Sequence, residues 1–350
     1  MKINIYLLVF GILALIIVAA AASTFVFNQN LSSRNVTLQN YGQAPNFQGI
    51  TAWINSPSIN ITQLRGKVVL VDFWTYSCIN CIRTIPFLNA LDAKYGREGL
   101  VIVGVHSPEF QFEANYTNVL NAVQRFGIEY PVALDSNHST WDAYHNQYWP
   151  ADYIIDANGT IRYEQFGEGD TNTTQIVIQQ LLKSAGYNIN SSFVNFTDSA
   201  NFSQIGSPET YFGYSTARAP LGNAQGFVPG NVVNYIGPNI SQANTAYLSG
   251  EWYNAPDGMV AVNNSKIFFV YKAKNVNIVA SGNSSITIRL DESNLQPSYL
   301  GADDKIVNGS ATAIINSSRL YDIVSAPSYG IHILEIDAKP GFKIYTFTLG

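Results

Sequence analysis

Two cysteines are the residues of this 350-residue chain best suited to chemistry. Cys78 and Cys81 are separated by only two residues, and the chain has no other cysteine. A bridge between such close positions cannot staple distant segments, so the pair indicates local redox chemistry and not a disulfide-rich scaffold. Thiolates exchange with disulfides through a mixed disulfide. The spacing therefore predicts a redox-active dithiol.

The flanking segments predict how this dithiol is positioned. Val68–Trp74 is an apolar run interrupted only by Asp72, which is typical of a central buried strand. Isoleucine and leucine recur at three-residue steps in Asn80–Tyr95 and predict an amphipathic helix. Free backbone N–H groups and the helix dipole favour a thiolate at a helix start. We expect Cys78, at that start, to attack and Cys81, one turn inside, to resolve.

The resolving step needs a base for the thiol of Cys81. Asp72 is the candidate, because a carboxyl group inside an apolar strand has its pKa raised by desolvation toward a useful value. The alternative is that Asp72 is a structural hydrogen-bond acceptor.

The residues around the dithiol resemble the thioredoxin active-site segment. The likeness rests on Val71-Asp72-Phe73-Trp74-x-x-x-Cys78-x-x-Cys81, with Pro86 five residues after the second cysteine. This resemblance implies an α/β thioredoxin fold in which Pro150 is a cis-proline facing the dithiol and Trp74 packs beneath it. A plain turn proline is the alternative for Pro150.

Further segments narrow the resemblance. The stretches 74–84 and 104–110 are similar to the TlpA/DipZ branch of membrane-anchored thioredoxins, and the segments 247–252, 319–321 and 345–350 are similar to its C-terminal β-domain of carbohydrate-binding-module type. Full DipZ chains begin with a multi-helix membrane electron carrier, whereas this sequence has one apolar span there. The resemblance therefore implies a separate membrane electron donor of CcdA type.

Glu109 and His106 follow the predicted buried strand Leu100–Val105, whose end is expected near the dithiol. Either side chain could tune the cysteines or relay protons. Solvated loop positions are the alternative for both.

The sequence predicts five parts: a transmembrane anchor or signal peptide (1–27), a polar stalk (28–44), a thioredoxin-like domain (45–185), a linker (186–208) and an all-β sandwich of jelly-roll type (209–350). Further elements expected in the α/β part are a helix over Glu113–Phe126, a hairpin of Tyr153–Asp156 with Thr160–Phe166, and a helix over Thr173–Ala185. The expected strands of the β-domain are Tyr247–Trp252, Lys266–Tyr271, Val276–Ala280, Ser285–Leu290, Arg319–Val324, Gly330–Asp337 and Phe342–Leu349.

The N-terminus predicts an extracytoplasmic protein. Ile3–Phe27 carries no charge and is long enough to cross a bilayer, while Lys2 precedes it and Arg34 is the next charge. The expected location is the cell membrane with the domains outside; cleavage after a signal peptide would give a secreted protein instead. Asn-x-Ser/Thr sequons exceed what composition predicts and favour N-glycosylation.

Composition excludes several functions. The net charge is −5 without a basic run, so nucleic-acid binding has no electrostatic basis. The four histidines match no zinc-ligand spacing, and we expect neither metal nor cofactor. The expected partners are exported proteins with thiols or disulfides, and aromatics such as Trp252 could offer a glycan surface.

Two other functions compete with dithiol exchange. One is a peroxiredoxin-like peroxidase, for which Thr75 is suitably placed, although Val71 occupies the position where a proline is expected. The other is a surface glycan-binding protein with an inert thioredoxin scaffold.

Overall fold

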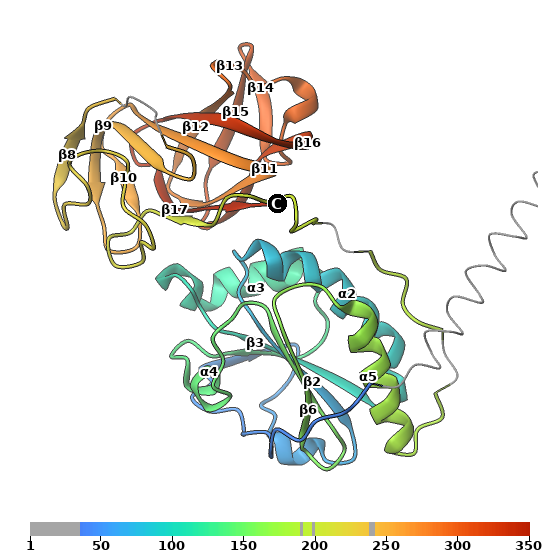
Figure 1. Cartoon of the computed structure of the whole chain (residues 1–350). Helices are drawn as coiled ribbons and strands as arrows, with labels where there is room; N and C mark the ends of the chain where they lie inside the picture. The colour runs from blue at the N-terminus through green and yellow to red at the C-terminus, as the bar shows by residue number, and fades with distance from the viewer. Residues whose placement is uncertain (1–35, 190–191, 198–199, 238–241) are drawn as a thin grey trace, which may run out of the picture. The chain divides into compact units, whose positions relative to one another are not determined.

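The computed structural model describes residues 36–189, 192–197, 200–237 and 242–350, in two compact units. The first comprises the described residues up to Thr75 with Arg83–Pro108 and Val119–Thr197; the second comprises Tyr76–Ile82, Glu109–Asn118 and Asp198–Gly350 (Figure 1). The predicted anchor (1–27) and the start of the predicted stalk lie outside the described residues. Within the described ranges, no helix has the length and apolar character needed to span a bilayer.

The first unit is built on a six-stranded sheet. Its described strands are β1 (Ala52–Ile54), β2 (Val68–Trp74), β3 (Leu100–His106), β4 (Val132–Leu134), β5 (Ala151–Ile155) and β6 (Ile161–Phe166), in the order β1-β4-β3-β2-β5-β6. The helices are α2 (Ile79–Tyr95), α3 (Tyr116–Arg125), α4 (Ser139–Ala143) and α5 (Thr171–Ser184), with short 3₁₀ turns at Ile61–Leu64, Gly96–Glu98 and Gln111–Ala114. β2 is parallel to β3 and antiparallel to β5. This is the predicted thioredoxin-like α/β arrangement.

β2 is the centre of that sheet. All seven of its residues are buried, as a strand covered on both faces requires. On one face Phe73 contacts the ring of Trp141 on α4 and that of Tyr144, the residue after α4, with ring centroids 5.8 and 5.3 Å apart. Figure 1 shows α5 on the side of the sheet away from α4. The carboxyl end of β2 leads directly into the Cys-x-x-Cys turn.

The structure corrects the helix expected over Glu113–Phe126. A 3₁₀ turn ends at Ala114, and α3 begins only at Tyr116. Asn115 separates them, because its side-chain oxygen accepts the N–H groups of Thr117 and Asn118 at 2.9 and 3.2 Å. Asparagine is favoured at this capping position, since its side chain satisfies helix N–H groups that have no partner within the helix.

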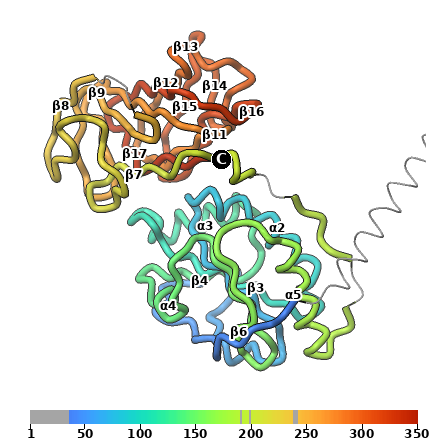
Figure 2. The backbone as a smooth tube through the Cα atoms, in the orientation of Figure 1, coloured from blue at the N-terminus to red at the C-terminus, as the bar shows by residue number. Residues whose placement is uncertain are grey.

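The chain that precedes β1 runs beside β6 (Figure 2). The N–H of Tyr41 donates to the carbonyl of Ile161 at 3.1 Å, and Gln43 forms an isolated bridge with Thr160. The described end of the predicted stalk therefore adds hydrogen bonds at the outer edge of β6, which pairs with β5 on its other side.

The second unit contains an antiparallel sheet of eleven described strands. They are β7 (Thr210–Tyr211), β8 (Val232–Tyr235), β9 (Ala246–Asn254), β10 (Met259–Ala261), β11 (Ser265–Ser281), β12 (Ser284–Leu290), β13 (Ser293–Asn294), β14 (Asp304–Val307), β15 (Ser310–Ile315), β16 (Arg319–Ala338) and β17 (Lys343–Leu349). A 3₁₀ turn covers Pro297–Tyr299. Alternating residues such as Ile267, Phe269 and Tyr271 on β11 fill one core. The C-terminal part is β-rich as expected, and its jelly-roll topology stays a prediction.

Two pairs of expected strands are single long strands. Lys266–Tyr271 and Val276–Ala280 are both part of β11, while Arg319–Val324 and Gly330–Asp337 are both part of β16. The apolar alternation breaks between them because the register shifts between Ala273 and Asn275. A β-bulge interrupts the alternation of side chains without ending a strand. In the sequence such an interruption has the same pattern as a turn, and we therefore predicted two strands in each case.

The cap at Asn115 gives a testable prediction. Asn115→Ala should lower the free energy of unfolding by about 1 kcal/mol, because two N–H groups lose their acceptor. Asn115→Asp keeps an acceptor and should be close to the wild type. Both variants also remove the Asn115 sequon, so glycosylation does not distinguish them. Urea unfolding followed by circular dichroism makes the comparison, and equal stability of the two variants would contradict the capping role.

Candidate active site

Cys78 lies where α2 starts. Its carbonyl accepts the N–H of Ile82 at 3.0 Å, and its Sγ accepts the N–H of Cys81 at 3.3 Å. The sulfur thus occupies the place of a helix-capping side chain, where backbone N–H groups favour a thiolate. Cys78 is partly exposed, whereas Cys81 is fully buried. The accessible sulfur is therefore also the one supported by the helix start.

Glu113 holds the residue before Cys78. Its Oε1 accepts the hydroxyl of Ser77 at 2.5 Å and the N–H of Ser77 at 3.3 Å. Its Oε2 accepts the N–H groups of Glu109 and Phe110 at 2.6 and 2.8 Å. This carboxylate is fully buried and connects the Cys-x-x-Cys turn to the segment after β3. Sequence reasoning missed it, and the available signal was an acidic residue within an aromatic-rich stretch.

Glu109 was expected near the dithiol and lies beside Glu113. Burial, reinforced by the charge of Glu113, raises the pKa of Glu109 to about 8. The hydroxyl of Tyr211 donates to its Oε1 at 2.5 Å. Glu109 therefore belongs to a buried acidic cluster of the second unit and is not a solvated loop position.

Asp72 faces a second carboxyl group. The two central strands pair Asp72 with Asp152 directly across β2 and β5. Asp72 is 1% exposed, and neither of its oxygens nor Oδ1 of Asp152 has a hydrogen-bond donor. Two ionised carboxylates cannot bond to each other, but a shared proton lets one donate to the other.

Electrostatics agree with a shared proton. Burial raises the pKa of Asp72 well above its ordinary value, and the charge of Asp152 raises it further. Burial also raises the pKa of Asp152, to about 7. Sequence reasoning identified Asp72 but missed Asp152, although an aspartate two residues after Pro150 in an apolar strand was visible.

The segment around Pro150 is fixed from several sides. The peptide bond between Trp149 and Pro150 is cis, which is the geometry that the resemblance implies. The carbonyl of Pro150 accepts the N–H of Gly167 at 2.9 Å, and the indole N–H of Trp149 donates to the carbonyl of Ser107 at 3.0 Å. Glu168, the residue after Gly167, forms a largely buried ion pair with Arg83 of α2. The nitrogen and oxygen atoms are 3.1 Å apart.

Trp74 and His106 end the two parallel central strands. Both are buried, and their rings meet edge to face with centroids 5.0 Å apart. Burial lowers the pKa of His106 to about 3, so its imidazole is neutral at physiological pH. Gly104 makes room for the indole, since a Cβ there would lie 2.9 Å from Nε1 of Trp74. Both aromatic residues thus have structural contacts at the ends of their strands.

The described part of the chain contains no cluster of three or more histidine, cysteine, aspartate or glutamate residues arranged to hold a metal ion.

Comparisons with known proteins agree with this geometry. Residues 42–164 match the AhpC/TSA family and residues 207–350 match a thioredoxin-like C-terminal domain family. Protein DipZ from Mycobacterium bovis is 36% identical over 92% of this chain and 45% of its own length. The thiol-disulfide oxidoreductase YkuV from Bacillus subtilis is 31% identical over 35% of this chain and 82% of its own length. The chain belongs to the thioredoxin-like thiol-disulfide oxidoreductases.

The relatives match different lengths of this chain. YkuV and the oxidoreductase ResA from Bacillus thuringiensis, 27% identical over 46% of this chain and 88% of its own length, match a region of domain size. The DipZ match extends over most of the chain, but this chain spans less than half of DipZ.

The carboxyl pair predicts a specific pH dependence. Because the folded-state pKa of Asp152 is about 7, against an ordinary value of 3.8, the folded state retains a proton that the unfolded chain releases between these values. The resulting stabilisation is present below about pH 4 and is lost as the pH rises through about 7.

When the pH is raised from 4 to 7, the free energy of unfolding should therefore fall less in Asp152→Asn than in the wild type. The difference between the two losses should be on the order of 1 kcal/mol or more. Asp142→Asn, which changes an exposed carboxylate of α4, is the matched control and should follow the wild type. Urea unfolding at a series of pH values measures the slopes. Parallel slopes for the wild type and Asp152→Asn would reject the shared proton.

Proposed function

We propose that this protein catalyses thiol-disulfide exchange with protein clients, with Cys78 as the attacking thiol and Cys81 as the resolving thiol. The observation that carries the proposal is the hydrogen bond from the N–H of Cys81 to Sγ of the partly exposed Cys78 at the start of α2. The fold supports it, because the thiol lies at the carboxyl end of a central parallel strand, where α/β sheets place their sites.

The exchange has two steps. The Cys78 thiolate attacks one sulfur of a client disulfide, forming a mixed disulfide and releasing the other sulfur as a thiolate that takes up a proton. The Cys81 thiolate then attacks Sγ of Cys78 and releases the second client sulfur. The client gains two electrons and two protons, and the protein keeps a Cys78–Cys81 disulfide.

The second step requires removal of a proton from Cys81. We assign this to Asp72, whose pKa is raised by burial, with Asp152 sharing the proton. Pro150 is assigned to face the dithiol and Trp74 to pack beneath it, as the family resemblance implies. Glu109 is assigned a tuning role through its contact with Glu113.

We assign the direction of electron flow to reduction of clients. The Ile-Asn pair between the cysteines contains no histidine that would strongly stabilise the Cys78 thiolate, and a less stabilised reduced form makes a better reductant. The reaction then needs a source of electrons, for which a CcdA-type membrane protein is the proposed donor.

The proposed location is the outer side of the cell membrane, with residues 1–27 as a single-pass anchor and exported proteins as clients. The apolar span, the charge pattern around it and the excess of sequons support this location.

The C-terminal unit, as a jelly-roll domain, is proposed to bind glycans. Trp252, one of the aromatic residues considered for that role, is fully buried and contributes to the core instead.

A reduction assay tests the function. The full chain should accelerate the reduction of insulin disulfides by dithiothreitol, and Cys78→Ser should return the rate to that of dithiothreitol alone, since the attacking sulfur is gone. Turbidity of the released insulin B chain gives the rate. Equal rates for the two proteins would reject the exchange function, and consumption of peroxide by the wild type would favour the peroxidase alternative.

Trapping tests the two cysteine roles. Cys81→Ala should accumulate mixed disulfides with exported clients, because the attacking thiol has lost its resolving partner, whereas Cys78→Ala should not. Non-reducing electrophoresis after acid quenching detects the adducts. Equal trapping by both variants would overturn the assignment.

A further inference from the structure

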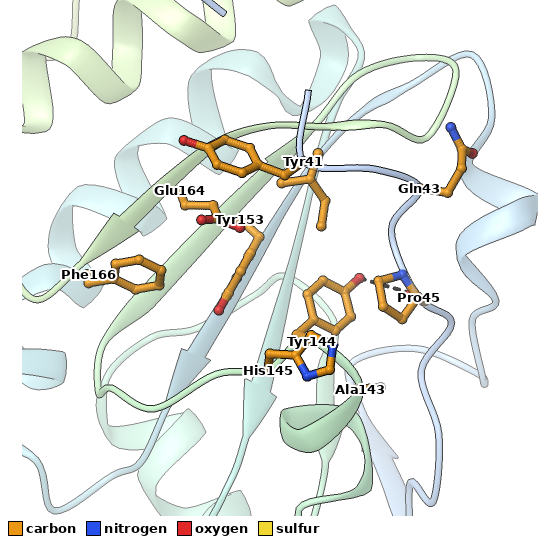
Figure 3. A pocket seen from close by; sticks show the side chains of 10 residues that line it. Tyr41, Gln43, Pro45, Ala143, Tyr144, His145, Tyr153, Glu164 and Phe166 are labelled. Atoms are coloured by element: carbon orange, nitrogen blue, oxygen red, sulfur yellow. Dashed lines mark hydrogen bonds between the residues drawn. The ribbon is translucent and has the colours of Figure 1, made fainter. Parts of the chain in front are cut away.

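A pocket of the first unit lies outside the proposed dithiol site. It has a volume of about 320 Å³ and opens beside β6 (Figure 3). Its lining includes three tyrosines, one phenylalanine, one histidine and one carboxylate. The lining residues are Tyr41, Gln43, Pro45, Ala143, Tyr144, His145, Tyr153, Ile161, Glu164 and Phe166.

Glu164 is the charged group of this pocket. Figure 3 places its carboxyl group among the rings of Tyr41, Tyr153 and Phe166. Burial raises the pKa of Glu164. Burial also raises the pKa of Tyr153, and the charge of Glu164 raises it further, so the carboxylate lies partly withdrawn from water next to a ring. Among the described residues, no lysine, arginine or histidine lies within ion-pair distance of Glu164. No ion pair therefore engages this carboxylate, although His145 also lines the pocket.

The walls of the pocket are held by hydrogen bonds. The hydroxyl of Tyr144 donates to the carbonyl of Pro45 at 3.0 Å, and the hydroxyl of Tyr153 donates to Oδ1 of Asn146 at 3.3 Å. The backbone of Tyr41 is bonded to β6 at Ile161. Two of the aromatic side chains, those of Tyr144 and Tyr153, are therefore held in place before any ligand arrives, which lowers the entropic cost of binding.

Aromatic faces and a carboxylate both attract positive charge. The face of a tyrosine or phenylalanine ring is negative and binds ammonium or guanidinium groups, while an anionic ligand would be repelled by Glu164. We propose that this pocket binds the guanidinium or ammonium group of a basic side chain of a polypeptide client.

The surroundings favour a polypeptide over a free small cation. Phe166 pairs with Ala151, the residue after Pro150, and its ring lies 5.2 Å from that of Tyr148. Phe166 is 45% exposed and Tyr148 is 52% exposed. An exposed aromatic strip thus runs from the pocket to the segment at Pro150. The choice of a client chain as the ligand rests on the proposed exchange function, whereas the binding of a cation does not.

Calorimetric titration of the full chain tests the proposal. The ligands are a cysteine-free peptide with one central arginine, the same peptide with neutral citrulline, and butylguanidinium as a free cation. The arginine peptide should bind about tenfold or more tightly than the citrulline peptide, and more tightly than butylguanidinium. Equal binding of the two peptides would overturn the proposal, and equal binding of butylguanidinium would overturn the polypeptide assignment.

Two variants locate the binding. Glu164→Gln removes the charge, and Phe166→Leu removes a ring while keeping an apolar side chain. Each substitution should weaken the binding of the arginine peptide about fivefold to tenfold. Glu129→Gln, which changes an exposed carboxylate before β4, is the matched control and should bind as the wild type does. Unchanged affinity in Glu164→Gln would refute the site. Melting temperatures of all variants show whether a loss of binding reflects unfolding.

The peptides contain no cysteine, so this measurement is separate from exchange. Loss of insulin reduction with retained arginine-peptide binding would reject the exchange function and leave the cation site standing. Insulin reduction without selective binding of the arginine peptide would reject the cation site alone.

Discussion

Burial of β2 on both faces is the constraint on which the site depends. The strand carries no exposed residue, yet four residues after its end the chain presents the partly exposed sulfur of Cys78. A chain leaving a fully covered strand needs its turn to be fixed by other groups. Glu113 fixes this turn, because its carboxylate accepts hydrogen bonds from both the hydroxyl and the N–H of Ser77. The strand sets where the dithiol lies, and the buried carboxylate sets the path of the turn that presents it.

The same burial determines the behaviour of the acids. Asp72 and Asp152 face each other across adjacent strands without a donor from any other described group, so the pair gains most by holding one proton. Glu109 and Glu113 form a second acidic pair, in which Glu113 accepts several hydrogen bonds, while burial and then the charge of Glu113 raise the pKa of Glu109. In both pairs burial is the main reason that a carboxyl group holds its proton more tightly than in water.

The sequence predicted the elements whose signals are local. The apolar run of β2 and the three-residue period of α2 were sufficient to predict these two elements, and the spacing of Cys78 and Cys81 at the helix start predicted their chemistry. Asp152 and Glu113 were missed because their significance depends on strand register and on a turn distant in sequence. The broken helix at Asn115 and the bulge near Ala273 were missed because each is a short interruption that periodicity cannot interpret.

The long pairing of β11 with β16 has a consequence for how the chain folds. Ser265 pairs with Ala338 and Ala280 pairs with Arg319, so the central ladder of the C-terminal sheet joins residues far apart in sequence. Such contacts close slowly, because the entropy of a long loop is lost before the contacts form. Until β16 has been synthesised, β9 can pair only with the stretch Lys266–Phe269 of β11, and the rest of the long β11–β16 ladder has no second strand. The interval between synthesis of β11 and β16 therefore leaves an open strand edge, at which another chain could pair.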